Sequence, residues 1–168
     1  VPARPANAGA PVALITLRDQ RALALGPGVA AHVYDPAAAA WGHLPAIPNP
    51  RTAPTATRLA DGRVLVAGEV AGAERQDHAA VALDDGRVLL LGGTIGDVAE
   101  IPPTLVFDGA AWRNAVPVTA VRSAATAFVL AGEPTMVALT AGRPIDDRTF
   151  ELYDLGPSCA TRALGGAP

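Results

Sequence analysis

The chain contains two nearly identical short segments in close succession. Residues 61–68 read DGRVLVAG and residues 85–92 read DGRVLLLG, with Gly93 completing a double glycine. Each copy combines an Asp-Gly turn, an apolar run typical of a buried strand, and a glycine that ends the run. Neighbouring copies of such a unit must bury one another's apolar faces, so the repeat constrains the fold more than any single residue does. The sequence therefore predicts a repeat protein built from small β-sheets.

The composition favours an all-β fold. Of the 168 residues, 17 are Gly and 16 are Pro, which suits many short strands joined by tight turns and argues against long helices. Half of the residues are hydrophobic but only 4% are aromatic. We therefore expect the core to consist mostly of Ala, Val and Leu.

Charge and hydropathy exclude two classes of partner. The net charge is -3, and the 13 basic residues are all Arg and are scattered along the chain, whereas a protein that binds nucleic acid needs a clustered basic face. No apolar run reaches the roughly 18 residues that a membrane-spanning helix needs. We expect neither nucleic-acid binding nor a direct membrane span. The single Cys159 is open to three interpretations: a small apolar residue near a strand end, half of a disulfide to a partner outside this sequence, or a reactive thiol.

An arginine keeps a fixed place ahead of the turn glycine. It precedes the glycine by the same interval in two units and stands one position closer to it in a third. We expect these framework arginines to tie one sheet to the next through planar, multi-donor contacts, and Arg63 and Arg87 to donate hydrogen bonds between strands or sheets. The framework arginines are Arg51, Arg75 and Arg122, and the corresponding turn glycines are Gly62, Gly86 and Gly132.

A second pattern consists of an aromatic residue, an Asp directly after it, and a Trp a few residues later. It is typical of a hairpin in which the ring is buried and the Asp side chain accepts the hydrogen bonds that start the turn. The pattern is complete in two places and lacks its Trp in a third. Its members are Tyr34, Asp35 and Trp41, then Phe107, Asp108 and Trp112, and finally Tyr153 and Asp154.

Together the two patterns divide the chain into four units, at 9–50, 51–74, 75–121 and 122–168. The third unit predicts a four-stranded antiparallel sheet. Its second strand is apolar on both faces, so it must be covered on both sides. A small sheet flanked on both faces by its neighbours is typical of a β-propeller blade.

The order of these residues resembles Kelch repeats of the bacterial, galactose-oxidase-like type. Such repeats run through Arg, Ala-Thr, Leu-x-Asp-Gly-Arg-Val-Leu, Gly-Gly, Tyr-Asp-Pro and Trp, and the resemblance covers nearly all of the chain. It implies an all-β fold, a β-propeller of four-stranded antiparallel blades. About four blades are visible, one of them incomplete, and we expect them to belong to a six- or seven-bladed ring.

The second unit departs from the Kelch pattern. It spans only 51–74, whereas the third spans 75–121, and it lacks the Tyr-Asp-Trp half. Glu69 also follows Gly68 where a second glycine is expected. The hypothesis is that a segment as long as the difference between the two units is missing between Gly68 and Val70.

The family that this chain resembles includes copper-radical oxidases. These enzymes require two Tyr, two His and a Cys bonded to one Tyr. Tyr34 and Tyr153 occupy the framework position that packs within a blade instead. The three histidines, His32, His43 and His78, hold different positions in their units, so a shared metal site would have to converge from separate blades. The acidic residues supply too few spaced oxygens for a calcium loop. We expect no catalytic residue, metal or cofactor.

The predicted function is that of a non-catalytic Kelch-type binding or scaffold module. Affinity would reside in the variable loops around residues 92–103 and 141–149, and the partner would be a protein or a larger assembly, with a glycan as a further candidate. The resemblance to bacterial members implies export, to the periplasm, the outer membrane or the exterior. Two alternatives stay open: a catalytic propeller, oxidase or lyase, and a structural subunit of a large envelope assembly. The candidate partner-binding residues are Asp97, Glu100, Asp146, Asp147 and Arg148.

Overall fold

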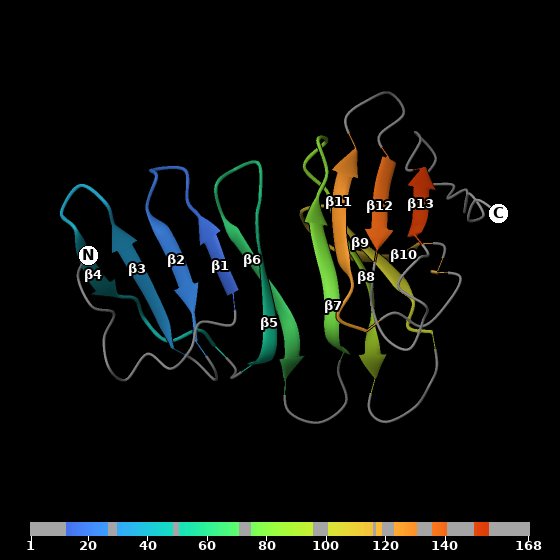
Figure 1. Ribbon diagram of the computed structural model, residues 1–168, viewed down its shortest axis with the longest axis horizontal. Coiled ribbons are helices and arrows are strands. Elements are labelled where there is room, and N and C mark those ends of the chain that lie inside the picture. The colour runs from blue at the N-terminus through green and yellow to red at the C-terminus, as the bar shows by residue number, and fades with distance from the viewer. Residues whose placement is uncertain are drawn as a thin grey trace. The chain divides into compact units, whose positions relative to one another are not determined.

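The computed structural model describes residues 13–26, 30–48, 51–70, 75–95, 101–115, 117–118, 123–130, 136–140 and 150–154. These residues form β-strands, turns and connecting segments, which confirms the all-β class (Figure 1). No described residue is helical, so this part of the chain contains no helix that could cross a membrane. The chain divides into two compact units, Val1–Glu74 and Arg75–Pro168.

The first unit contains two antiparallel sheets. The four strands of the first sheet pair in chain order, and those of the second form one hairpin. The strands of the first sheet are β1 (Ala13–Thr16), β2 (Ala22–Leu25), β3 (Ala31–Asp35) and β4 (Ala40–His43), and those of the second are β5 (Arg51–Arg58) and β6 (Val64–Val70). The second sheet has two strands, which agrees with the absence of the aromatic half from its sequence. The sequence predicts that residues are missing around Glu69 and Val70. Both residues lie in β6, where they pair with Thr52 and Arg51 of β5.

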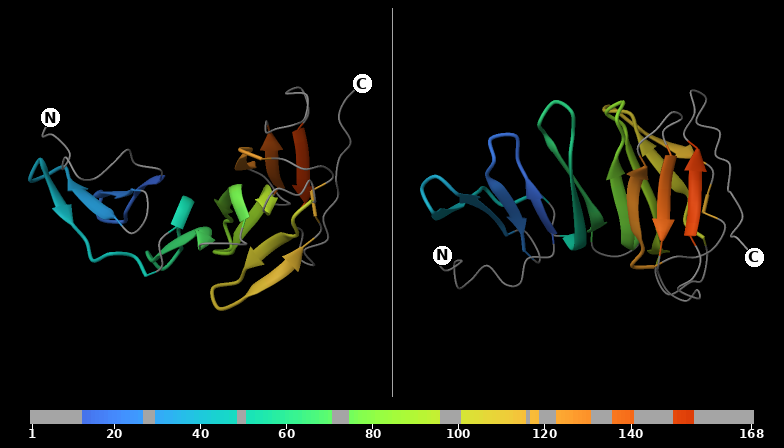
Figure 2. Two further views of the ribbon diagram at one scale, coloured as in Figure 1. Left: turned by 90° about the horizontal axis from the view of Figure 1, so that it is seen from below. Right: turned by 45° about the horizontal axis from the view of Figure 1, so that its top comes forward.

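The second unit also contains two antiparallel sheets, again with strands in chain order. The strands of the first sheet are β7 (Arg75–Ala82), β8 (Val88–Ile95), β9 (Thr104–Phe107) and β10 (Trp112–Ala115), and those of the second are β11 (Thr126–Leu130), β12 (Met136–Thr140) and β13 (Phe150–Asp154). The sheet of β11–β13 lies against the sheet of β7–β10 as a second layer (Figure 2). No closed ring of strands is present among the described residues.

The Asp-Gly turn has the geometry of a type I turn followed by a left-handed residue. In the third unit of sequence, the Gly86 amide donates to the Leu83 carbonyl at 3.0 Å, and the Leu83 amide donates to the Arg87 carbonyl at 2.8 Å. Gly86 has a φ of 87°, a conformation that costs glycine little. The same two bonds recur around Gly62 and around Gln20, so the turn repeats three times although glycine occupies its left-handed position only twice.

Arg63 and Arg87 pair with the Asp of their own turns. The Arg63 Nε donates to Asp61 Oδ2 at 2.6 Å, and the Arg87 Nε donates to Asp85 Oδ2 at 2.6 Å. The prediction that these two arginines bridge strands or sheets missed this local contact. We call this contact between an Arg side chain and the Asp of its own turn the Asp-Arg clamp. It forms because the backbone amide of each Arg also donates to the other oxygen of the same carboxylate.

The two aromatic hairpins form as predicted. Tyr34 pairs in register with Trp41, Phe107 pairs with Trp112, and in both pairs the ring centroids are 5.2 Å apart. Asp108 Oδ1 accepts the amides of two alanines at 3.0 and 2.8 Å, as Asp35 does in its own turn. The rings are only partly buried, and Trp112 is 40% exposed, because each ring pair lies toward the edge of its sheet.

Each unit has its own core. In the second unit the two sheets share a core that contains Leu89, Leu91, Val137 and Leu139, all fully buried. Residues 88–93 of β8 are buried at every position, so this strand is covered on both faces as its sequence predicts. In the first unit, Leu23, Leu25 and Ala31 pack with partly buried residues from both sheets.

Candidate functional site

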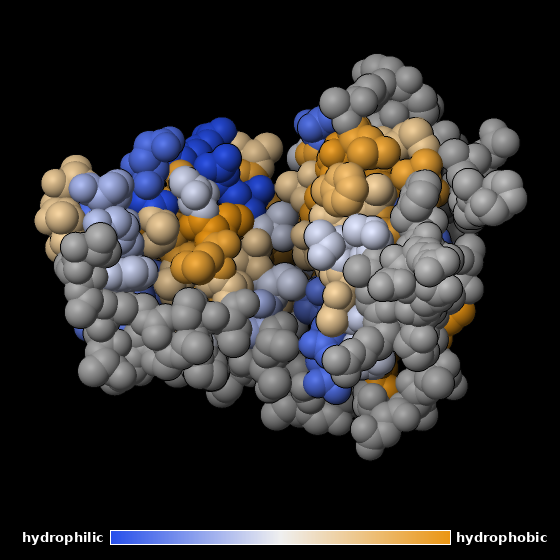
Figure 3. All heavy atoms as spheres, in the orientation of Figure 1, coloured by the Kyte–Doolittle hydropathy of each residue, from blue (hydrophilic) through white to orange (hydrophobic). Residues whose placement is uncertain are grey.

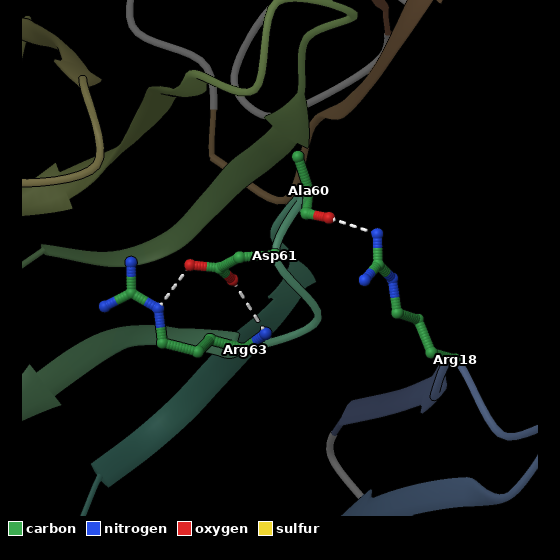
Figure 4. A network of polar contacts seen from close by, with 4 residues as sticks. All are labelled: Arg18, Ala60, Asp61 and Arg63. Carbon is green, nitrogen blue, oxygen red and sulfur yellow. Dashed lines mark hydrogen bonds and ion pairs between the residues drawn. The ribbon is translucent and has the colours of Figure 1, made fainter.

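In the first unit, the two sheets are joined by arginines that cross between equivalent positions. Arg18 Nη2 donates to the Ala60 carbonyl at 2.5 Å (Figure 4), and Arg58 Nη1 donates to the Thr16 carbonyl at 3.1 Å. The two bonds span the same interval of sequence. The Asp residues of the two turns, at positions 19 and 61, are separated by that interval as well. Each sheet therefore contacts the next through the same place in the repeat.

The second unit also joins its sheets through residues one repeat apart, but it does so near the framework arginines and not beside the turns. The Ala124 amide donates to the Asp77 carbonyl at 2.8 Å. The framework arginines Arg75 and Arg122 are separated by the same interval as these two residues, so both contacting residues stand two places after a framework arginine. Asp77 and Ala124 have φ values of 55° and 56°, so both turn left-handed to make the bond.

The third framework arginine is followed by a related irregularity. In the hairpin of β5 and β6, the register shifts between Thr52 and Thr55, which includes the second place after Arg51. The backbone is therefore irregular two places after the framework arginine in all three units, as a left-handed residue in two of them and as a register shift in the other.

A buried polar cluster lies at the end of the second unit where β7 begins, close to Asp77 in the sequence. Arg75, His78 and Thr104 are only 9%, 6% and 0% exposed. Arg75 Nη2 donates to the Pro103 carbonyl, directly before Thr104. A Cβ placed on Gly93 would lie 2.8 Å from Arg75 Cγ and 3.1 Å from His78 Cβ, which puts both side chains against the double glycine. The bond to Pro103 links two segments of one sheet, whereas the sequence predicts that Arg75 ties neighbouring sheets.

Burial governs the charges in the polar cluster. It lowers the pKa of His78 to about 4, with a further lowering from the Arg75 charge, so the imidazole is neutral at pH 7. Burial also lowers the pKa of Arg75 to about 10, which leaves the guanidinium charged. Within the described part of the chain, Arg75 Nη1 and Thr104 Oγ1 have no hydrogen-bond partner.

The polar cluster marks the end of the unit from which the variable loops leave. Residues 96–103 connect β8 to β9 and residues 141–149 connect β12 to β13. β7 and β11 lie side by side and run in the same direction (Figure 1), and both begin at the end that holds Arg75. Both connections therefore leave the strands at this end. The candidate partner-binding residues Asp97, Glu100, Asp146, Asp147 and Arg148 themselves lie outside the described residues.

The structure brings together two histidines that sequence reasoning kept apart. His32 pairs with His43 across β3 and β4, and their rings meet edge to face with centroids 4.8 Å apart. The pairing of Tyr34 with Trp41 fixes this register, because two steps from each in opposite directions reach His32 and His43. The aromatic hairpin could have revealed the pair. Within the described residues, no group of three or more His, Cys, Asp or Glu is placed to hold a metal ion.

The remaining framework residues are partly described. Gly62 and Gly86 lie in the repeated turns, and Asp35 and Asp108 start the aromatic hairpins. Cys159 and its interpretations lie outside the described residues. The same holds for Arg122 and Gly132, and for the side chains of Arg51 and Asp154.

The described contacts between sheets thus join equivalent positions of the repeat. Such an arrangement separates a packing framework from segments that can vary. A scan against protein-family models gives no match to this chain, and a search of curated proteins gives none.

Proposed function

We propose that this chain is a Kelch-type repeat module, with blade-like sheets arranged as in a propeller, that binds a protein partner through the connections at the Arg75 end. One observation carries the proposal. Contacts between sheets join residues whose separation equals the spacing of the repeat itself, in the first unit and in the second. Stacking through equivalent positions is how repeat proteins build an extended framework.

Binding is assigned to the connections because the framework is occupied with packing. The turns at the opposite end are short and closed by the Asp-Arg clamps, which leaves little freedom to adapt to a partner. The connections at 96–103 and 141–149 are longer, differ in sequence, and carry charged residues. Loops held by a rigid scaffold are the usual place for recognition residues.

The test compares the partner proteins that three forms of this chain capture in an affinity experiment. One is the unaltered chain, the second carries Asp146→Ser, Asp147→Ser and Arg148→Ser, and the third carries Asp84→Ser in a turn at the opposite end. Recovered proteins are quantified by mass spectrometry after each variant is shown to be folded by circular dichroism. We expect at least one protein to be lost with the triple variant and retained with Asp84→Ser. Recovery of the same partner proteins in equal amounts by all three forms of the chain would contradict the assignment of binding to these connections.

A further inference from the structure

The hairpin of β5 and β6 lacks the strands that complete the other sheets. In each of the other three sheets, the second strand pairs with a first strand on one side and with a third strand on the other. β6 holds the place of a second strand, since it follows the same Asp-Gly-Arg turn as β8. It pairs with β5 alone, and within the described residues no strand pairs with its other edge, here called the open edge. The sheet therefore ends at a strand that the repeat elsewhere places in the middle.

The exposure of β6 differs from that of β8 although the two strands begin with similar sequences. Residues 88–91 of β8 are at most 5% exposed, whereas residues 64–68 of β6 are all only partly buried. The arginine before each strand follows the same trend, because the Arg63 side chain is 66% exposed and the Arg87 side chain 27%. β6 thus combines the apolar sequence of a central strand with the exposure of an edge strand.

The open edge presents backbone hydrogen-bonding groups. Successive residues of an antiparallel strand direct their N–H and C=O groups alternately to the two sides. The Arg63 carbonyl accepts the Leu59 amide at 2.8 Å on the β5 side, so Leu65 and Ala67 also face β5. Val64 and Val66 therefore direct their N–H and C=O groups to the open edge. Such an edge is a template for pairing with another polypeptide segment.

The other sheets show which sequence fits this edge. Their third strands share an aliphatic residue, an aromatic residue and an Asp in succession, at Val33-Tyr34-Asp35, Val106-Phe107-Asp108 and Leu152-Tyr153-Asp154. In the two four-stranded sheets, the aromatic residue pairs with the first residue of the second strand, Ala22 or Val88. The equivalent residue of β6 is Val64, so an Asp after the aromatic residue would lie opposite Arg63.

The charges at this end of β6 favour an acidic residue. Hydrophilic side chains gather over the turns of both sheets of the first unit (Figure 3). Arginines outnumber carboxylates there, so an added carboxylate is attracted to the site. The charged residues are Arg18, Arg21, Arg58 and Arg63, with Asp19 and Asp61.

We propose that β6 binds, by antiparallel strand addition, an extended segment of a partner protein that carries the aliphatic-aromatic-Asp pattern of the third strands. Main-chain hydrogen bonds to Val64 and Val66 hold the segment, while its aromatic and Asp side chains set the register. The site does not use the connections to which partner binding is assigned above, so the two proposals stand or fall separately.

Hydrogen exchange of the full chain, followed by NMR, tests the proposal with a synthetic peptide of residues 101–109, which includes β9 and Asp108. Without peptide, we expect the Val64 and Val66 amides to exchange faster than those of Leu65 and Ala67. Peptide at ten times its dissociation constant should slow exchange at Val64 and Val66 roughly tenfold. Exchange in β8 should not change, because β9 already pairs with it.

Two methylated peptides provide matched controls. The Asp108 amide donates to the Ala111 carbonyl on the β10 side, so in alternation Leu105 faces β8 and Val106 faces β10. Methylation of the Leu105 nitrogen should therefore abolish the effect of the peptide, whereas methylation of the Val106 nitrogen should leave it intact.

Three results would overturn the proposal. The first is unchanged exchange at Val64 and Val66 at every peptide concentration up to the solubility limit, and the second is equal protection by the two methylated peptides. The third is protection of these amides that grows with the concentration of the chain in the absence of peptide, since this would assign the open edge to a second copy.

Discussion

At Gly93, the second residue of the double glycine, the addition of a single methyl group should strongly destabilise the fold. Its φ is 86°, a conformation that other residues rarely adopt. A Cβ there would lie 2.5 Å from the Gln76 carbonyl oxygen and 2.8 Å from Arg75 Cγ. The carbonyl belongs to the paired strand β7, so it cannot move aside without shifting the backbone.

The matched control is Gly109. Its φ is 99°, but a Cβ added there would meet no atom within 4 Å. Gly109→Ala therefore changes only the backbone preference, which costs roughly 1–2 kcal/mol and is offset by about 0.4–1 kcal/mol from the stiffer unfolded chain. The net loss should be about 1 kcal/mol. Gly93→Ala adds a steric term of about 1–3 kcal/mol for forcing neighbours apart, giving roughly 2–4 kcal/mol in total.

The assay is urea unfolding followed by tryptophan fluorescence. The chain has two tryptophans, Trp41 in the first unit and Trp112 in the second. A Trp41→Phe background leaves Trp112 to report on the unit that holds both glycines. In thermal unfolding, the expected loss for Gly93→Ala corresponds to a fall in Tm of roughly 10–20 °C for a unit of this size. Equal losses for the two alanine variants would refute the close approach of β7 to the double glycine.

Three further predictions concern titration and turn strain. Because burial lowers the pKa of His78 to about 4, the unfolded chain binds a proton more readily than the folded one; stability should therefore fall as the pH drops from about 6.5 toward 4. The same unfolding assay at stepped pH should give a flatter profile for His78→Gln, and identical profiles would contradict the buried neutral imidazole. The pKa of Asp108 is lowered to about 2, first by the amides of Ala111 and Ala110 and then by Arg113, so its contribution is present above about pH 3.8 and is lost as the pH falls toward 2. Acid unfolding should show a shallower loss of stability below about pH 3.8 for Asp108→Asn, and a slope equal to that of the unaltered chain would count against the amide contacts. Gln20 adopts a φ of 68° where the other turns have glycine, so Gln20→Gly should raise stability by about 0.5 kcal/mol, as measured through Trp41 in a Trp112→Phe background; a loss of stability would be inconsistent with the equivalence of the three turns.

The sequence predicts the local structure well because local structure depends on short-range rules. The Asp-Gly-Arg sequence selects one turn, which forms at both of its copies, and the same two hydrogen bonds recur at Asp19-Gln20-Arg21. The aromatic pattern predicts hairpins that begin with an Asp turn, and the hairpins at Asp35 and Asp108 do form. A run such as Val-Leu-Leu-Leu, placed between turn signals, favours a strand buried on both faces, and β8 is buried throughout that run.

The contacts of the arginines could not be predicted, because a long side chain reaches several acceptors at equal cost. Arg63 and Arg87 bind within their own turns, and the sheets of the first unit are joined by Arg18 and Arg58 instead. Arg75 reaches a carbonyl within its own sheet. Spacing alone does not distinguish these choices, since each offers an acceptor to the donors of the guanidinium.

The left-handed residues leave no signal in the sequence either. Ala124 belongs to a type that usually avoids positive φ, and Asp77 adopts it inside a strand rather than in a turn, so propensity identifies neither. They are strained because a bond between two sheets requires it, which is a tertiary cause. Only their shared place after the framework arginine could have suggested that they act together.

The central claim is that successive sheets contact one another through equivalent positions of the repeat. Hydrogen exchange of the Ala124 amide, followed by NMR, tests it most directly, because this amide precedes β11 and is satisfied by the Asp77 carbonyl of the neighbouring sheet. We predict exchange as slow as that of the paired amides in β7. Exchange at the rate of an unstructured chain would contradict the claim.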